Sequence, residues 1–230
     1  MAIIQIAGVL DAAEARMIAD AGVHWIGFPL KLAVHPDDVP ADVARTIIHE
    51  VRAHARPVLI TYLDRADEVR SLCAFLGVRA VQLHGHIAAE ELARLRALDD
   101  GLYVMKSLVV KTDNAATLEA MVDELSPHVD AFITDTYDPT TGAMGATGKI
   151  HDWSVSRRLV EISRRPVILA GGLRPENVRE AILTVCPFGV DVHTGVEGPD
   201  GRKDPRLVRR FVAAASGAFA DLQRGGAAAE

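Results

Sequence analysis

Residues that can transfer protons stand at the ends of several short β-rich runs. His84 and His86 close the stretch AVQLHGH, Asp135 closes AFITD, and His193 closes FGVDVH. An imidazole titrates near neutral pH, and a carboxyl group can be tuned toward it, so both side chains are suited to general acid–base catalysis. We therefore expect proton transfer on a small molecule where these runs end.

Two strand ends, one new and the other that of FGVDVH, carry small residues that favour anion binding. LAGGLRPENV places Gly171 and Gly172 between a strand and a helix, and HTGVEG places Thr194 and Gly195 after the following strand. Glycine lets a phosphate approach backbone N–H groups closely, and a helix N-terminus adds partial positive charge. These four residues are predicted to bind phosphate, with a short extra helix in the last loop. Two ordinary tight turns are the alternative.

Eight β-rich runs alternate with amphipathic segments along the chain. Most of the runs are almost wholly apolar, which is typical of parallel strands covered on both faces. Strands are expected at residues 3–8, 24–28, 57–62, 80–84, 102–107, 131–135, 166–171 and 188–193, and helices include 12–22, 40–55, 66–77, 88–99, 175–185 and 205–223.

This alternation of strands and helices predicts a single-domain α/β protein. The expected architecture is a parallel eight-stranded (β/α)₈ TIM barrel over residues 1–225, with 226–230 as a disordered tail. In such barrels the active site lies at the carboxyl ends of the strands, where the residues above stand. No GxGxxG follows the first run, which argues against a dinucleotide cofactor, and we expect no cofactor at all.

Composition narrows the classes of partner. The 230 residues are 49% hydrophobic and 24% charged, with a net charge of −6 and basic residues scattered among acidic ones. This balance argues against nucleic acid, and no apolar run approaches the ~20 residues of a membrane span. We expect a cytoplasmic protein, a monomer or homodimer, that binds a small phosphorylated substrate.

At this point several motifs resemble one family. These motifs are VQLHG (81–85), ITDT (133–136), TGKIHDW (147–153), LAGGLRPENV (169–178) and VDVHTGVEGPDGRKD (190–204). They are similar in order and spacing to the motifs of phosphoribosylanthranilate isomerase. Two further stretches, IQIAGV (4–9) and IGF (26–28), match that family more loosely. The resemblance implies an aldose–ketose isomerisation of the Amadori type, acting on an N-linked phosphoribosyl amine in tryptophan biosynthesis. It implies that Asp135 is the general acid that protonates the furanose ring oxygen.

Two positions depart from the family pattern. The family's catalytic cysteine, which removes the proton from C2 of the opened sugar, falls on Ala7, and the family's carboxylate-binding arginine after the second strand is missing from GFPLKLAVHPDDV. The last strand neighbours the first in a closed barrel, and its end holds His193 where the family usually has a small hydroxyl residue. Our hypothesis is that His193 serves as the base; a packed histidine without a proton role is the alternative.

Further candidates for substrate binding are His84, Lys31, His35 and Lys106. Lys31 and His35 are the cationic groups nearest the missing arginine, although neither offers its bidentate fork. Lys106, at the end of the fifth strand, could face the barrel mouth or sit as a charge at its rim. His84, His86, Asp135 and His193 would also form a chemically sensible metal site, but we predict none, because the family resembled needs no metal.

Other functions stay open. A different phosphosugar isomerase, epimerase or lyase, with or without a metal, would use the same phosphate site. A non-catalytic barrel that binds a phosphorylated metabolite would account for the loss of the base, but it would give Asp135 little reason to be buried.

Overall fold

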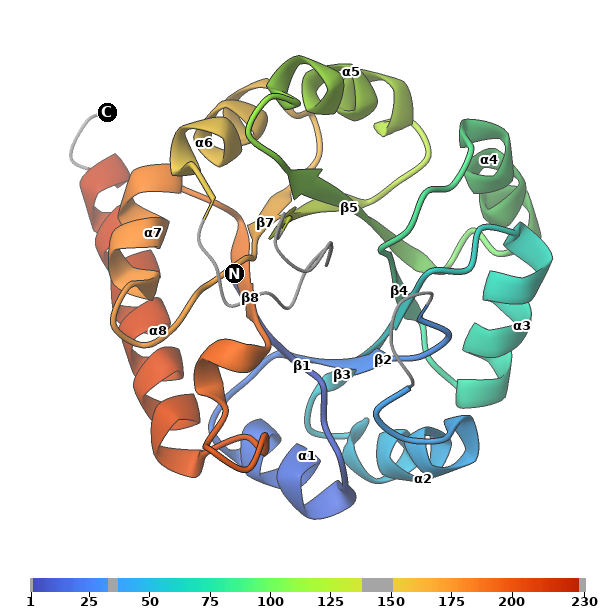
Figure 1. Ribbon diagram of the computed structural model, residues 1–230, viewed down its shortest axis with the longest axis horizontal. Coiled ribbons are helices and arrows are strands. Elements are labelled where there is room, and N and C mark those ends of the chain that lie inside the picture. The colour runs from blue at the N-terminus through green and yellow to red at the C-terminus, as the bar shows by residue number, and fades with distance from the viewer. Residues whose placement is uncertain (1, 33–36, 138–150, 228–230) are drawn as a thin grey trace.

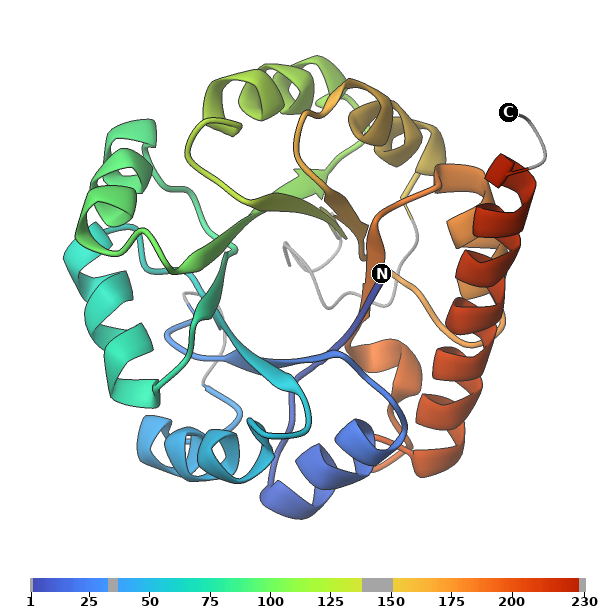
Figure 2. The same cartoon turned by 180° about the vertical axis from the view of Figure 1, so that it is seen from behind.

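The protein is a closed parallel barrel. A computed structural model describes residues 2–32, 37–137 and 151–227, and in it each strand pairs with the next along the chain while the last pairs with the first. Helices surround the barrel in a ring (Figures 1 and 2). The predicted (β/α)₈ barrel is therefore confirmed.

The strands are β1 (Ile3–Ala7), β2 (Trp25–Pro29), β3 (Arg56–Thr61), β4 (Ala80–Leu83), β5 (Tyr103–Val110), β6 (Ala131–Thr136), β7 (Val167–Leu169) and β8 (Gly189–Val192). The helices are α1 (Ala12–Asp20), α2 (Ala41–Val51), α3 (Ala66–Leu76), α4 (Ala89–Leu98), α5 (Ala115–Leu125), α6 (Trp153–Ile162), α7 (Val178–Val185) and α8 (Pro205–Ala227), with a 3₁₀ turn η1 (Thr194–Val196).

Differences from the sequence prediction are confined to element ends. β7 stops at Leu169 rather than residue 171, because Gly171 and Gly172 adopt φ values of +96° and +64°, which a strand cannot accommodate. α8 continues through Ala227, and residues 228–230 lie outside the described residues. None of the described helices is both long and apolar enough to cross a membrane.

Alternation along the strands divides the barrel interior into two zones. Nearest the amino ends of the strands is an apolar floor of Ile3, Trp25, Val58, Ala80, Met105, Ala131, Ile133, Ile168 and Ala170. Next toward the carboxyl ends lie buried polar side chains, which we call the polar layer: Gln5, Gln82, His84, Ser107, Asp135 and Asp191. Because successive strand residues face opposite sides, the residues between these pack outward against the helices.

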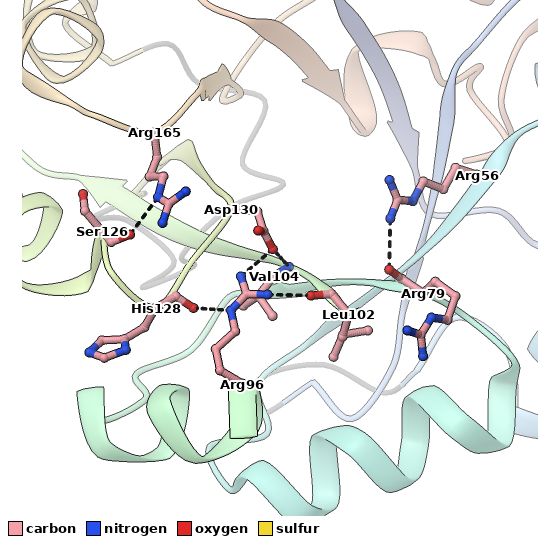
Figure 3. Close-up of polar contacts among 9 residues, drawn as sticks. All are labelled: Arg56, Arg79, Arg96, Leu102, Val104, Ser126, His128, Asp130 and Arg165. Atoms are coloured by element: carbon pink, nitrogen blue, oxygen red, sulfur yellow. Dashed lines mark hydrogen bonds and ion pairs between the residues drawn. The ribbon is translucent and has the colours of Figure 1, made fainter. Parts of the chain in front are cut away.

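Arginine side chains tie the loops together at the amino ends of the strands (Figure 3). Arg96, on α4, donates from Nε to the carbonyl oxygen of His128 (2.9 Å) and from Nη1 to that of Leu102 (2.8 Å), and it pairs with Asp130. The same carboxylate accepts the N–H of Val104 at 2.7 Å. Asp130 thus fixes the start of β5 against the loop that leads into β6.

The contribution of the contact between Arg96 and Asp130 to stability at the amino ends of the strands can be tested. Asp130→Ala leaves the guanidinium and the Val104 N–H without their shared, partly buried acceptor, so we expect a loss of about 2–4 kcal/mol in the free energy of unfolding by urea. Asp67→Ala, which removes the partner of the exposed Arg94, is the matched control and should cost less than about 1 kcal/mol. Equal losses would contradict this assignment.

Candidate active site

The four residues predicted to bind phosphate line one cavity. Gly171 and Gly172 after β7, and Thr194 and Gly195 after β8, share it with Asp135, Ala170, Leu173, Asp191, Val192 and His193. Thr194 and Gly195 belong to the 3₁₀ turn η1, the short extra helix expected in this loop. The cavity therefore joins the two glycine-containing loops to two carboxyl groups of the polar layer.

Glycine is required in both loops for steric reasons. A Cβ atom on Gly195 would lie 1.8 Å from the carbonyl oxygen of Leu173, and one on Gly171 would lie 2.1 Å from Oγ1 of Thr136. The first contact is with backbone, which cannot rotate away as a flexible side chain can. The loops after β7 and β8 thus pack against each other at a distance that only glycine allows.

Asn177 positions the loop after β7, a role that the sequence reasoning missed. Its side-chain amide donates to the carbonyl oxygen of Gly172 (3.0 Å), and its Oδ1 accepts the N–H of Arg174 (2.8 Å). The residue is buried and immediately precedes α7. An asparagine beside a Gly-Gly turn at the start of a helix was the available signal, since its side chain is suited to bonding nearby backbone groups.

Asp135 lies at the carboxyl end of β6 and is almost completely buried. Burial raises the pKa of its carboxyl group, while the imidazole of His84 and the N–H of Thr136, which donates to Oδ1 at 2.7 Å, act to lower that pKa. A carboxyl group with a raised pKa holds its proton to higher pH and can act as an acid. Its position at a strand end beside the phosphate loops suits the role predicted for it.

A chain of hydrogen bonds crosses the polar layer from β1 to His84. Gln5 Nε2 donates to Gln82 Oε1 (3.1 Å), Gln82 Nε2 donates to Ser107 Oγ (3.2 Å), and His84 Nδ1 lies 3.0 Å from Ser107 Oγ. The ring of Tyr62, at the end of β3, packs against the imidazole with centroids 5.0 Å apart. His84 is thereby fixed within the barrel mouth, and its electrostatic influence reaches Asp135.

Asp191 is a second buried carboxyl group, and the sequence reasoning did not select it. Burial and, to a smaller extent, the nearby Asp135 raise its pKa to about 7, against the opposing effects of Gln5 and Lys203. Among the described residues its Oδ1 has no hydrogen-bond partner. The available signal was an acidic residue in the middle of the otherwise apolar run FGVDV.

His193 lies beside the end of β1, as the sequence predicts for neighbouring strands. Its ring packs on Gly8, where a Cβ would come within 2.0 Å of Nε2, and Gly8 directly follows Ala7. Burial, with a smaller effect of the charge of Lys203, lowers the pKa of His193 to about 3. The imidazole is therefore neutral near pH 7, and its role as a base stays a prediction.

A buried ionic network holds the loops after β1 and β8 together. Glu14 accepts the N–H groups of Leu10 and Lys203, both at 2.7 Å. The ammonium group of Lys203 in turn donates to Glu197 Oε1 (2.7 Å) and to the carbonyl oxygen of His193 (3.1 Å). These contacts fix the backbone at the end of β8, next to the phosphate loop.

Lys106 and Lys31 are not among the residues that line this cavity. Lys106 sits between the inward-facing Met105 and Ser107, so its side chain starts from the outer face of β5. Its Nζ donates to the carbonyl oxygens of Ser107 (2.8 Å) and Leu83 (3.3 Å), and burial lowers its pKa to about 8. Lys31 is exposed, in the loop after β2, and His35 lies outside the described residues.

No cysteine of the chain supplies the thiol missing at Ala7. Cys73 is buried on α3, where burial raises its pKa to about 12. Cys186 ends α7, before β8 begins, and therefore lies toward the opposite end of the barrel from the phosphate loops. The described residues contain no group of three His, Cys, Asp or Glu side chains placed to hold a metal ion.

His151 links the end of β6 to α6. Its Nδ1 lies 2.8 Å from Oγ1 of Thr136, and its Nε2 lies 2.6 Å from Oγ of Ser156. Burial lowers the pKa of His151 to about 4. The neutral imidazole therefore braces Thr136, the neighbour of Asp135, against the first helix that follows.

These features define a class: a barrel with a glycine-lined cavity suited to an anion at its carboxyl end and buried titratable groups beside it. Comparison with known proteins identifies the family. The model of the family described as "N-(5'phosphoribosyl)anthranilate (PRA) isomerase" matches residues 4–214. The chain belongs to the phosphoribosylanthranilate isomerase family.

Individual relatives agree with this assignment. N-(5′-phosphoribosyl)anthranilate isomerase of Haloferax volcanii is 41% identical over 216 residues, which cover 92% of each chain. The structure of phosphoribosyl anthranilate isomerase from Thermotoga maritima is similar with a TM-score of 0.79 and 28% identity, covering 94% of this chain and 100% of that one. A structure of the isomerase in complex with reduced 1-(o-carboxyphenylamino)-1-deoxyribulose 5-phosphate gives a TM-score of 0.78 and 26% identity, with the same coverage.

The close packing of Gly195 makes the anion site testable. In Gly195→Ala the added methyl group must displace the Leu173 carbonyl or the loop itself, so the backbone N–H groups lose their alignment. We expect inorganic phosphate to raise the melting temperature of the unchanged protein, and at least about tenfold more phosphate to be needed for the same rise in the variant. Gly217→Ala on α8, where a Cβ meets no atom within 4 Å, is the matched control. An unaltered phosphate response in Gly195→Ala would contradict this site.

His151 should make stability depend on pH. In the unfolded chain His151 takes up a proton near pH 6.5, whereas in the folded protein it does so near pH 4. The unfolded chain therefore binds more protons between these values, and stability falls as the pH is lowered through them, by up to about 3 kcal/mol. His151→Gln should lose less stability between pH 6.5 and 4.5 in urea titrations. The exposed His86→Gln should keep the unmodified slope; equal slopes for all three proteins would contradict this account.

Proposed function

We propose that this protein catalyses the Amadori rearrangement of N-(5′-phosphoribosyl)anthranilate, with Asp135 as the general acid. The observation that carries the proposal is the placement of a buried carboxyl group with a raised pKa in the same cavity as two glycine loops suited to phosphate. The relatives named above carry the name of this activity. The reaction needs a general acid, a general base and a binding site for a phosphorylated sugar.

The first chemical step follows from the surroundings of Asp135. With the phosphate on the backbone N–H groups of Gly171, Gly172, Thr194 and Gly195, the protonated carboxyl group transfers its proton to the furanose ring oxygen. The bond from C1 to that oxygen breaks, and the nitrogen lone pair forms an iminium group. The N–H of Thr136, which already donates to Oδ1, stabilises the carboxylate that remains.

A second candidate substrate shares the phosphoribosyl amine but carries a different group on nitrogen. The observation that favours it is the loop after β2, in which residues 29–41 contain no arginine. Lys31, and His35 outside the described residues, are the cations that we propose would meet an aglycone carboxylate there. A lysine or histidine offers a point charge rather than a bidentate fork, so a carboxylate is bound less specifically.

Loss of anthranilate fluorescence on rearrangement gives the test. The purified protein should turn over phosphoribosylanthranilate, and Asp135→Asn should lower kcat by about 10²–10⁴-fold, the range for a lost acid or base. Asp204→Asn is the matched control and should retain full turnover, because asparagine keeps the oxygen that accepts the N–H groups of Arg206 and Leu207 at the start of α8. Phosphoribosylaniline, which lacks the carboxylate, is assayed in parallel. Turnover of the aniline compound alone would assign the second substrate, and turnover of neither would contradict the proposed function.

A further inference from the structure

One buried carboxyl group takes no part in the mechanism above. Asp191, in the middle of β8, is 7% exposed and lines the same cavity as Asp135 and the phosphate loops. Its Oδ1 has no hydrogen-bond partner among the described residues, although it is shielded from solvent. A buried carboxylate oxygen is costly to leave without a partner, so its presence points to a function in the cavity.

The position of Asp191 relative to Ala7 follows from the register of β1 and β8. Gln5 pairs with Asp191, and Ile6 pairs with Val192. Gln5 and Ala7 both face the interior on β1, as Asp191 does on β8, so Asp191 lies beside the strand that lacks the thiol and one layer below Ala7. The methyl group of Ala7 offers no atom that accepts a proton, and Asp191 is the carboxyl group nearest along the neighbouring strand.

The other groups near this end of the barrel are less suited to take a proton from carbon. His193 packs on Gly8 and is a weak base, because burial lowers its pKa to about 3. Lys106 starts from the outer face of β5 and bonds two carbonyl oxygens. Lys203 is committed to Glu197 and to the carbonyl oxygen of His193.

We propose that the carboxylate of Asp191 is the general base that removes the C2 proton of the opened sugar, in place of the missing thiol at position 7. The proposal rests on the proposed function, because it assigns a residue to the second step of that reaction. Asp191 on β8 and Asp135 on β6 then divide the proton transfers between two strands that line one cavity.

The proton transfers balance without a further reactant. After ring opening, Asp135 is a carboxylate and the substrate is an iminium. Asp191 takes the C2 proton, the C2–H electron pair forms the C1=C2 bond, and the C1=N pair returns to nitrogen. The resulting enolamine takes the proton from Asp191 at C1 and releases its hydroxyl proton to Asp135, which yields the ketose and restores both side chains.

Electrostatics favour this division of roles. Each carboxylate makes ionisation of the other less favourable, so the pair tends to hold one proton near neutral pH. The surrounding groups that favour the charged form of Asp191 are Gln5, Lys203 and the N–H of Val192. Those that act on Asp135 are His84 and the Thr136 N–H. One carboxyl group can thus start as the acid while the other starts as the base.

The test compares Asp191→Asn with variants at the other positions. Asp191→Asn keeps the side-chain shape, so the variant should fold and should bind reduced 1-(o-carboxyphenylamino)-1-deoxyribulose 5-phosphate within about threefold of the unchanged protein. Its kcat for phosphoribosylanthranilate should fall about 10²–10⁴-fold. His193→Ala should retain at least tenfold more turnover than Asp191→Asn. The double variant with Ala7→Cys and Asp191→Asn should turn over at least tenfold faster than Asp191→Asn alone. A merely structural role of Asp191 would not allow this rescue.

The outcomes separate the two proposals. Turnover by the unchanged protein together with full turnover by Asp191→Asn would overturn only the role of Asp191. The role of Asp191 would also be overturned if His193→Ala lost turnover while Asp191→Asn did not. The same holds if Ala7→Cys fails to restore turnover that Asp191→Asn has lost. Absence of turnover in the unchanged protein, with the reduced compound still bound, would overturn the proposed function and the role of Asp191 with it.

Discussion

The site depends on the burial of two carboxyl groups, Asp135 and Asp191, in one small cavity at the end of a closed barrel. Desolvation and mutual repulsion keep both from ionising easily, so the cavity holds a proton that can be moved. An open sheet would expose these groups to water and return their pKa values toward those of free carboxyl groups. The barrel wall is therefore what makes these two aspartates a candidate acid and a candidate base.

Everything around the cavity serves to hold that geometry. The apolar floor closes the barrel beneath the polar layer, and Arg96 with Asp130 ties the loops at the opposite end. Above, Glu14 and Lys203 join the loop after β1 to the loop after β8, so the phosphate loop and the end of the strand that carries Asp191 are fixed together. Gly195 allows these loops to approach closely. The chemistry is local, but its precision depends on contacts around the whole ring.

The barrel, the Gly-Gly turn after β7 and the short extra helix after β8 could be predicted from sequence because they follow from local pattern: apolar runs give the strands, and paired glycines mark the turns. Asp135 stood out because it ends a strand. Asp191 did not, since an aspartate inside a strand reveals its importance only when the barrel closes around it and brings it near Asp135. Lys106 is the opposite case: it stood out as a strand-end lysine, but its side chain starts from the outer face of β5. Because successive strand residues face opposite sides, a shift of one residue decides whether a side chain faces the cavity or the helices.

A crystal structure with reduced 1-(o-carboxyphenylamino)-1-deoxyribulose 5-phosphate tests the central claim most directly. The account predicts the phosphate on the backbone N–H groups of Gly171, Gly172 and Gly195. It also places a carboxylate oxygen of Asp191 within about 3.5 Å of C2, with Asp135 on the oxygen side of the sugar. A complex in which C2 instead lies against the ring of His193, with Asp191 turned away from the ligand, would contradict it.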